Sequence, residues 1–124
     1  MKTVVSVISA IIILIAGAIV ENRFIKKQFD ELNYSFSILY EKIDDETATE
    51  KDVYAVKEQW LNKKKSLHAF IPHNEIKEID LWLFETAVLV RDKEWTEALS
   101  KVDVLISLSK EIPKTFSLSV ENIF

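Results

Sequence analysis

Residues 3–20 form a run of eighteen positions without an ionisable side chain, directly after Met1 and Lys2. As a helix this run spans about 27 Å, close to the ~30 Å hydrocarbon core of a bilayer. Residues 1–20 are therefore predicted to form a transmembrane signal-anchor. Large aliphatic side chains supply its lipid-facing character: Ile8, Ile11, Ile12, Ile13, Leu14, Ile15 and Ile19.

Two alternatives to an anchor stay open. A cleaved secretory signal has the same layout, with Ala16-Gly17-Ala18 as the small residues of a cleavage site after Ala18. A buried helix of a soluble protein is the second. The chain has no cysteine, which excludes disulfides and lipid attachment to an N-terminal cysteine.

The charges that flank the run bear on its orientation. Arg23, Lys26 and Lys27 follow the run and only Lys2 precedes it, which by itself favours a cytoplasmic domain. A very short N-terminus, an apolar run and then a domain is, however, the layout of an export signal. We expect a single-pass protein of the cell membrane with its domain on the extracytoplasmic side.

The rest of the chain has a helical composition, since the only glycine, Gly17, lies in the apolar run. Strand patterns are almost absent. The predicted fold class is all-α, with the transmembrane helix continuing into a small antiparallel bundle of about four helices over residues 21–112. Two stacked helical hairpins are an alternative arrangement, because a shift of 41 positions aligns Ile71-Pro72 with Ile112-Pro113.

Apolar residues after the run recur at spacings of three and four, as in the a and d positions of a heptad. This spacing predicts that the first helix continues to about residue 43. The resulting seam packs against helices of the same chain, or it mediates self-association through a parallel coiled coil. It consists of Ile25, Phe29, Leu32, Phe36, Leu39 and Ile43.

The next two helices are bounded by capping residues and a proline. Thr49, followed three residues later by Asp52, predicts the start of the second helix, and Pro72 predicts its end. Asn74 is the predicted cap of a third helix over residues 75–91. This helix is apolar on most of its surface, so we expect it in the middle of the bundle.

The fourth helix is expected to begin near Trp95 and to end before Pro113, since proline disrupts a helix interior. Beyond it, Phe116, Leu118 and Val120 alternate with serines, a period typical of extended chain. Residues 113–124 are therefore predicted to form a C-terminal tail packed on the bundle.

Several segments of the C-terminal half together resemble a known family. They are the run that contains His73, Glu75, Ile76, Ile79 and Asp80, the aspartate-containing break before Trp95 and Ala98, the Ile112-Pro113 pair, and the terminal Asn122, Ile123 and Phe124. These segments are similar to domain-of-unknown-function family 4363, and the similarity covers most of the chain. The resemblance implies a short, bacterial, membrane-anchored helical protein and assigns no activity.

Residues with catalytic or metal-binding chemistry are sparse. His68 and His73 lie five positions apart across a predicted helix break, whereas metal-binding helices place ligands three or four apart. The sequence contains no glycine-rich phosphate loop and no nucleophile elbow. We expect no catalytic residue, no metal and no cofactor, and the protein is not expected to be an enzyme.

The net charge of −4 and the lack of a basic stripe argue against nucleic acid as a partner. The expected partners are membrane lipid, through the N-terminal helix, and an unknown protein or a second copy. The expected function is a non-enzymatic interaction module at the membrane surface. The alternative is a helical domain that binds a small hydrophobic ligand or lipid in an aromatic-lined groove. The aromatic residues expected in the core are Phe29, Phe36, Trp60, Phe70, Trp82, Phe84 and Trp95.

Overall fold

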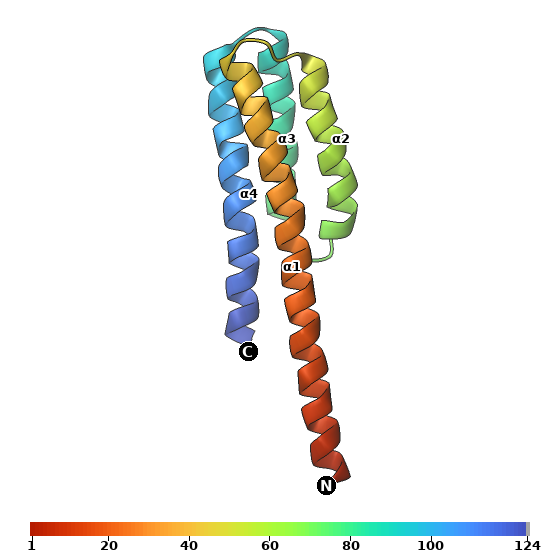
Figure 1. The fold of residues 1–124 in the computed structure, drawn as a ribbon. Helices are drawn as coiled ribbons and strands as arrows, with labels where there is room; N and C mark the ends of the chain where they lie inside the picture. The colour runs from red at the N-terminus through yellow and green to blue at the C-terminus, as the bar shows by residue number, and fades with distance from the viewer. Residues whose placement is uncertain (124) are drawn as a thin grey trace.

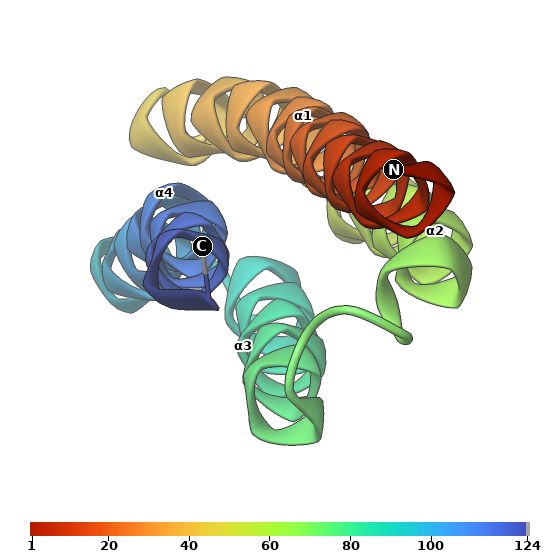
Figure 2. The same cartoon turned by 90° about the horizontal axis from the view of Figure 1, so that it is seen from below.

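The computed structural model describes residues 1–123 as four α-helices, and it describes side chains up to residue 116 (Figure 1). The helices are α1 (Lys2–Asp44), α2 (Glu50–Leu67), α3 (His73–Arg91) and α4 (Trp95–Ile123). They alternate in direction and surround one core, as the view along the bundle shows (Figure 2). The prediction of an all-α antiparallel bundle is confirmed, and the described residues contain no strand.

Helix α1 runs without a break from the apolar run into the bundle. Its N-terminal part projects alone beyond the other helices (Figure 1). By length and composition it is apolar enough to cross a membrane, and its apolar window is not buried by the rest of the described chain. A signal sequence near the N-terminus would satisfy the same criteria.

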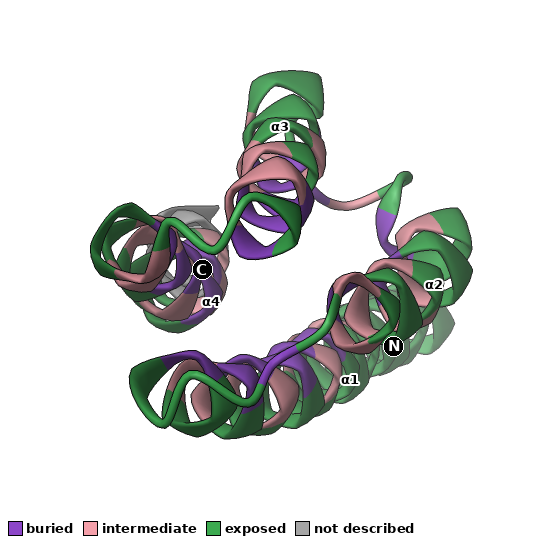
Figure 3. Cartoon of the chain, turned by 90° about the horizontal axis from the view of Figure 1, so that it is seen from above, coloured by how far each residue is buried: buried purple, intermediate pink, exposed green. Residues whose placement is uncertain are grey.

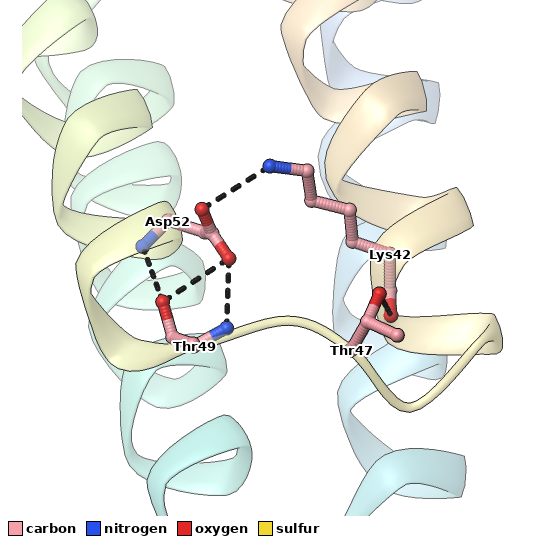
Figure 4. A network of polar contacts seen from close by, with 4 residues as sticks. All are labelled: Lys42, Thr47, Thr49 and Asp52. Carbon is pink, nitrogen blue, oxygen red and sulfur yellow. Dashed lines mark hydrogen bonds and ion pairs between the residues drawn. The ribbon is translucent and has the colours of Figure 1, made fainter.

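A capping box starts α2, as predicted. The backbone N–H of Asp52 donates to Thr49 Oγ1 (3.3 Å), and the backbone N–H of Thr49 donates to Asp52 Oδ2 (2.8 Å) (Figure 4). Lys42 of α1 also donates to Asp52 Oδ1 (3.2 Å). The same carboxylate therefore caps α2 and holds it to the end of α1.

Helix α3 begins two residues earlier than the sequence predicted, and Asn74 is not its cap. Pro72 occupies the N-cap position, and its carbonyl accepts hydrogen bonds from the backbone N–H groups of Glu75 (3.1 Å) and Ile76 (3.3 Å). Proline suits this position because the φ that its ring enforces precedes a helix without strain. The first turn is thus closed without a side-chain cap.

The expectation that α3 lies in the middle of the bundle is wrong. Helices α1 and α4 share the most extensive packing, and α3 lies between α2 and α4 (Figure 2). Coloured by burial, the helices are buried toward the shared core and exposed outside (Figure 3). In a ring of four helices every helix keeps an outer face, and on α3 this face carries Leu81 and Phe84.

The predicted aromatic core is confirmed in part. Phe29, Phe36 and Trp60 are fully buried. Phe70, Trp82 and Trp95 are half-buried against the core, with the Lys101 ammonium 4.7 Å from the Trp82 ring centroid. Phe84 is an exception, since it is exposed.

Helix α4 continues through Pro113 to Ile123, so the prediction that the helix stops before this proline is wrong. The extended conformation expected for the tail is also wrong over residues 113–123, whereas residue 124 and the side chains of residues 117–124 lie outside the described part. Pro113 removes one backbone donor from the helix. Ile112 is buried and Phe116 packs on the core, so tertiary packing on both sides of the proline keeps the helical path.

Candidate functional site

The heptad seam of α1 lies in the core of the same chain. All six of its side chains are at most 2% exposed. Asn33, which is close to the seam, donates to Ser109 Oγ of α4 (2.8 Å) and so fixes the register of α1 against α4. The seam residues therefore serve intramolecular packing in this structure, and any surface for a partner must be formed by other residues.

The two histidines do meet, across the α2–α3 turn (residues 68–72). The ring centroids of His68 and His73 are 6.4 Å apart in an edge-to-face arrangement. The carboxylate of Asp80, however, accepts hydrogen bonds from Trp60 Nε1 (2.6 Å) and Lys64 Nζ (2.8 Å). No group of three potential metal ligands occurs among residues 1–116, whose side chains the structure describes. Asp80 thus has a structural role that ties α2 to α3.

The structure brings two of the family-like residues together at one end of the bundle. Glu75 and Ile112 line the same small pocket with Pro72, and Ile76 and Ile79 are buried in the core. His73 and Glu78 are exposed at the start of α3, and Pro113 is half-buried on α4. The side chains of Asn122 and Ile123, and all of Phe124, lie outside the described residues.

This pocket has a volume of about 230 Å³ and lies between the α2–α3 turn and α4. Its walls are mainly apolar, and the rings of Phe70 and Phe116 meet edge to face with centroids 6.5 Å apart. The volume is below the range of roughly 300–1,000 Å³ that is usual for small-molecule sites. It can therefore hold only a small apolar group or part of a chain.

An apolar strip that was not predicted from the sequence lies on the outer surface of α2 and α3. Leu81 (53% exposed) and Phe84 (58%) lie on α3, and Tyr54 (46%) and Leu61 (41%) lie on α2. We call these four residues the α2/α3 strip. The sequence contains a signal for this strip. Apolar residues occupy most positions around the circumference of the third helix, and one buried face cannot accommodate all of them.

One contact indicates that the two halves of the strip face the same side. His68, which directly follows α2, lies edge to face with His73 of α3, with ring centroids 6.4 Å apart. Helical periodicity places Leu61 between Tyr54 and His68 on one face of α2. Leu81 and Phe84 lie between His73 and Arg91 on one face of α3 by the same periodicity.

Charged pairs fix the helices around these surfaces. Lys63 of α2 donates to Glu31 and to Gln28 (2.9 Å) of α1, and the hydrogen bond and charge of Lys63 lower the pKa of Glu31. Tyr54 donates to Glu50 Oε1 (2.6 Å), and this hydrogen bond raises the pKa of the Tyr54 phenol. The phenol therefore stays protonated at neutral pH and offers no nucleophile.

The chain is a small four-helix bundle whose first helix, α1, projects from the bundle as a long, apolar N-terminal segment. A model of the family described as domain of unknown function (DUF4363) matches residues 19–123. The chain therefore belongs to this family. No curated protein and no solved structure matches the chain.

Proposed function

We propose that this protein is a non-enzymatic interaction module held at the membrane surface by α1. In this proposal α1 is an uncleaved single-pass anchor in the cell membrane, and the bundle lies on the extracytoplasmic side. The anchor is supported by the exposed apolar window of α1 and by the unbroken helix that joins it to the bundle. The partner is a protein, and a second copy of the chain is the simplest candidate.

The α2/α3 strip is the single observation that carries the interaction role. Four large apolar side chains are between 41% and 58% exposed along two adjacent helices, although the core is otherwise well filled. Exposed apolar patches of this kind commonly mark protein–protein contacts. A partner helix could pack into such a strip through apolar residues spaced three and four apart.

Anchoring in one membrane favours a second copy as the occupant of the strip. Two copies with the same orientation present their strips at the same height above the bilayer, and confinement to a surface raises their effective concentration. An isologous contact then places the apolar part of one strip against that of the other. No new segment of the chain is required.

Site-specific photocrosslinking in the native membrane tests this role. A photoreactive residue in place of Leu81 should give adducts, and the same residue in place of the exposed Asp103 on α4 should not. The mass of the adduct distinguishes a second copy from another protein. Absence of an adduct at Leu81, with the anchor intact, would contradict the interaction surface.

A second candidate function is the binding of a small hydrophobic ligand or lipid chain between the helices. The pocket lined by Phe70, Ile112 and Phe116 favours it, because apolar and aromatic walls surround a space of about 230 Å³. Native mass spectrometry of the full chain should then show a bound lipid that Thr115→Trp, which fills the pocket, removes. An unchanged lipid load in that variant would exclude this pocket.

A further inference from the structure

The end of the bundle nearest the apolar run is formed by three segments at one level, which we call the base. Asn22 and Lys26 of α1 line a cleft together with Lys110, Pro113 and Lys114 of α4. The α2–α3 turn closes the base, since Phe70 contacts Phe116 of α4. The α2–α3 turn therefore lies near the level of α1 at which the apolar run ends.

No flexible linker separates the base from this run. Helix α1 is continuous from Lys2 to Asp44. Asn22 is only two positions beyond Val20, a rise of about 3 Å in a helix. If the run crosses the bilayer, the base is consequently held within the headgroup layer, which extends several ångströms beyond the hydrocarbon on each side.

Helix α4 reaches further in the same direction. It continues nine residues past Lys114 to Ile123, about 14 Å at the helical rise. Figure 1 shows its end beyond the α2–α3 turn, toward the N-terminus of α1. The backbone of α4 therefore approaches the bilayer more closely than the turn does.

The chemistry of the base suits a phospholipid headgroup layer. Phe70 and Phe116 are only half-buried, and phenylalanine rings can insert at the boundary between headgroups and acyl chains. Exposed cationic side chains occur on the lower parts of α1, α2 and α4, at Arg23, Lys26, Lys27, Lys65, Lys110 and Lys114. Acidic residues occur at the base as well, and Glu111 lies 3.6 Å from Lys114.

The opposite end of the bundle differs in charge. The α1–α2 loop carries Asp45 and Glu46, and the α3–α4 loop carries Asp92, Lys93 and Glu94, of which Asp92 pairs with Arg91. These exposed loop positions hold four acidic side chains and one basic one. An anionic lipid surface would repel this tip. The charge distribution and the continuous helix thus favour the same end of the bundle for contact with lipid.

From these observations we infer that the base is a second membrane-binding surface, in which the α2–α3 turn and the part of α4 around Lys110 and Lys114 lie in the phospholipid headgroup layer, while the last turns of α4 continue below that layer beside the apolar run. The bundle then rests directly on the membrane. The α2/α3 strip is held at a fixed height and extends from the base away from the bilayer. This inference rests on the proposed anchoring by α1 and adds the contact made by the bundle itself.

The absence of cysteine from the chain permits a direct test by spin labelling of the full-length protein. Ala69→Cys places a nitroxide on the exposed α2–α3 turn, Glu94→Cys places one at the acidic tip, and Ile13→Cys places one in the apolar run. Each variant is reconstituted in vesicles of phosphatidylcholine with a minor fraction of phosphatidylglycerol. Accessibility to oxygen, which enriches in lipid, is compared with accessibility to a water-soluble nickel chelate.

We expect the label at residue 69 to be several-fold less accessible to the nickel chelate than the label at residue 94, and the label at residue 13 to be accessible mainly to oxygen. Equal nickel accessibility at residues 69 and 94, with residue 13 in lipid, would overturn the inference and leave the anchor intact. A label at residue 13 that is exposed to water would overturn both. Because Ala69 is exposed, its replacement should preserve the fold, which circular dichroism checks.

Discussion

The indole of Trp60 on α2 donates a hydrogen bond to Asp80 Oδ1 on α3 at 2.6 Å. The second carboxylate oxygen of Asp80 accepts from Lys64 Nζ at 2.8 Å. Trp60 is fully buried, so Asp80 satisfies a polar atom that water cannot reach. This bond holds together two helices that pack less extensively than α1 and α4, and those same two helices carry the apolar strip.

Asp80→Ala should destabilise the full chain by about 1–3 kcal/mol, because a buried indole N–H is left without an acceptor. Chemical unfolding in detergent, followed by tryptophan fluorescence, to which Trp60, Trp82 and Trp95 contribute, measures the change. Asp103→Ala, at an exposed position of α4, is the matched control and should alter stability by less than about 0.5 kcal/mol. Equal effects of the two substitutions would show that the Trp60–Asp80 bond contributes nothing.

Leu83 and Leu81 occupy the same helix but different environments, since Leu83 is fully buried and Leu81 is exposed. Leu83→Ala should lower the free energy of unfolding by about 2–5 kcal/mol, and Leu83→Asp should prevent folding because it buries an unpaired carboxylate. Leu81→Ala should change stability by no more than about 0.5 kcal/mol. Thermal unfolding of the three variants tests these values, and a larger loss of stability in Leu81→Ala than in Leu83→Ala would mean that α3 is rotated relative to this structure.

The two prolines should respond to substitution in opposite directions. Pro113→Ala should raise the free energy of unfolding, because alanine restores a backbone donor inside α4. Pro72→Ala should lower it by about 0.4–1 kcal/mol, since the ring restricts the unfolded chain at a position with compatible φ. Thermal melts of the two variants test this difference, and a loss of stability in Pro113→Ala would indicate that the helix is broken there.

The capping box predicts a pH-dependent contribution to stability. The backbone hydrogen bond from Thr49 lowers the pKa of Asp52, with smaller contributions from Lys42 and the Thr49 hydroxyl. Because the pKa is lower in the folded state, the stabilisation is fully present above the unfolded value of about 3.9 and is lost as the pH falls through the folded value. The stability difference between the wild type and Asp52→Asn should therefore shrink on acidification below about pH 4.

Unfolding curves at neutral and acidic pH measure this difference. Asp103→Asn, which removes an exposed carboxylate from α4, serves as the control and should show little pH-dependent difference from the wild type. A difference that stays constant for Asp52→Asn across the titration would mean that the carboxylate charge plays no part in the cap.

The sequence by itself determined the features that depend on local interactions. The 3–4 spacing from Ile25 to Ile43 predicted a buried seam, and all six side chains are buried, because a helix places such residues on one face. The pairing of Thr49 with Asp52 predicted the start of α2, since a capping box involves only neighbours in the chain. The family and the four-helix fold were also predicted from the sequence, the family from short segments of residues and the fold from the spacing of apolar residues.

Only the tertiary structure decided which apolar faces are covered and whether Pro113 ends a helix. Phe84 and Leu83 are equally apolar in the sequence, yet Leu83 faces the core and Phe84 faces away from it, because the placement of α2 and α4 leaves the outer side of α3 open. At Pro113 the local preference favours an end, but the packing of Ile112 and Phe116 on the core maintains the helix. Periodicity and propensity act within one segment, whereas burial depends on neighbours that are distant in the chain.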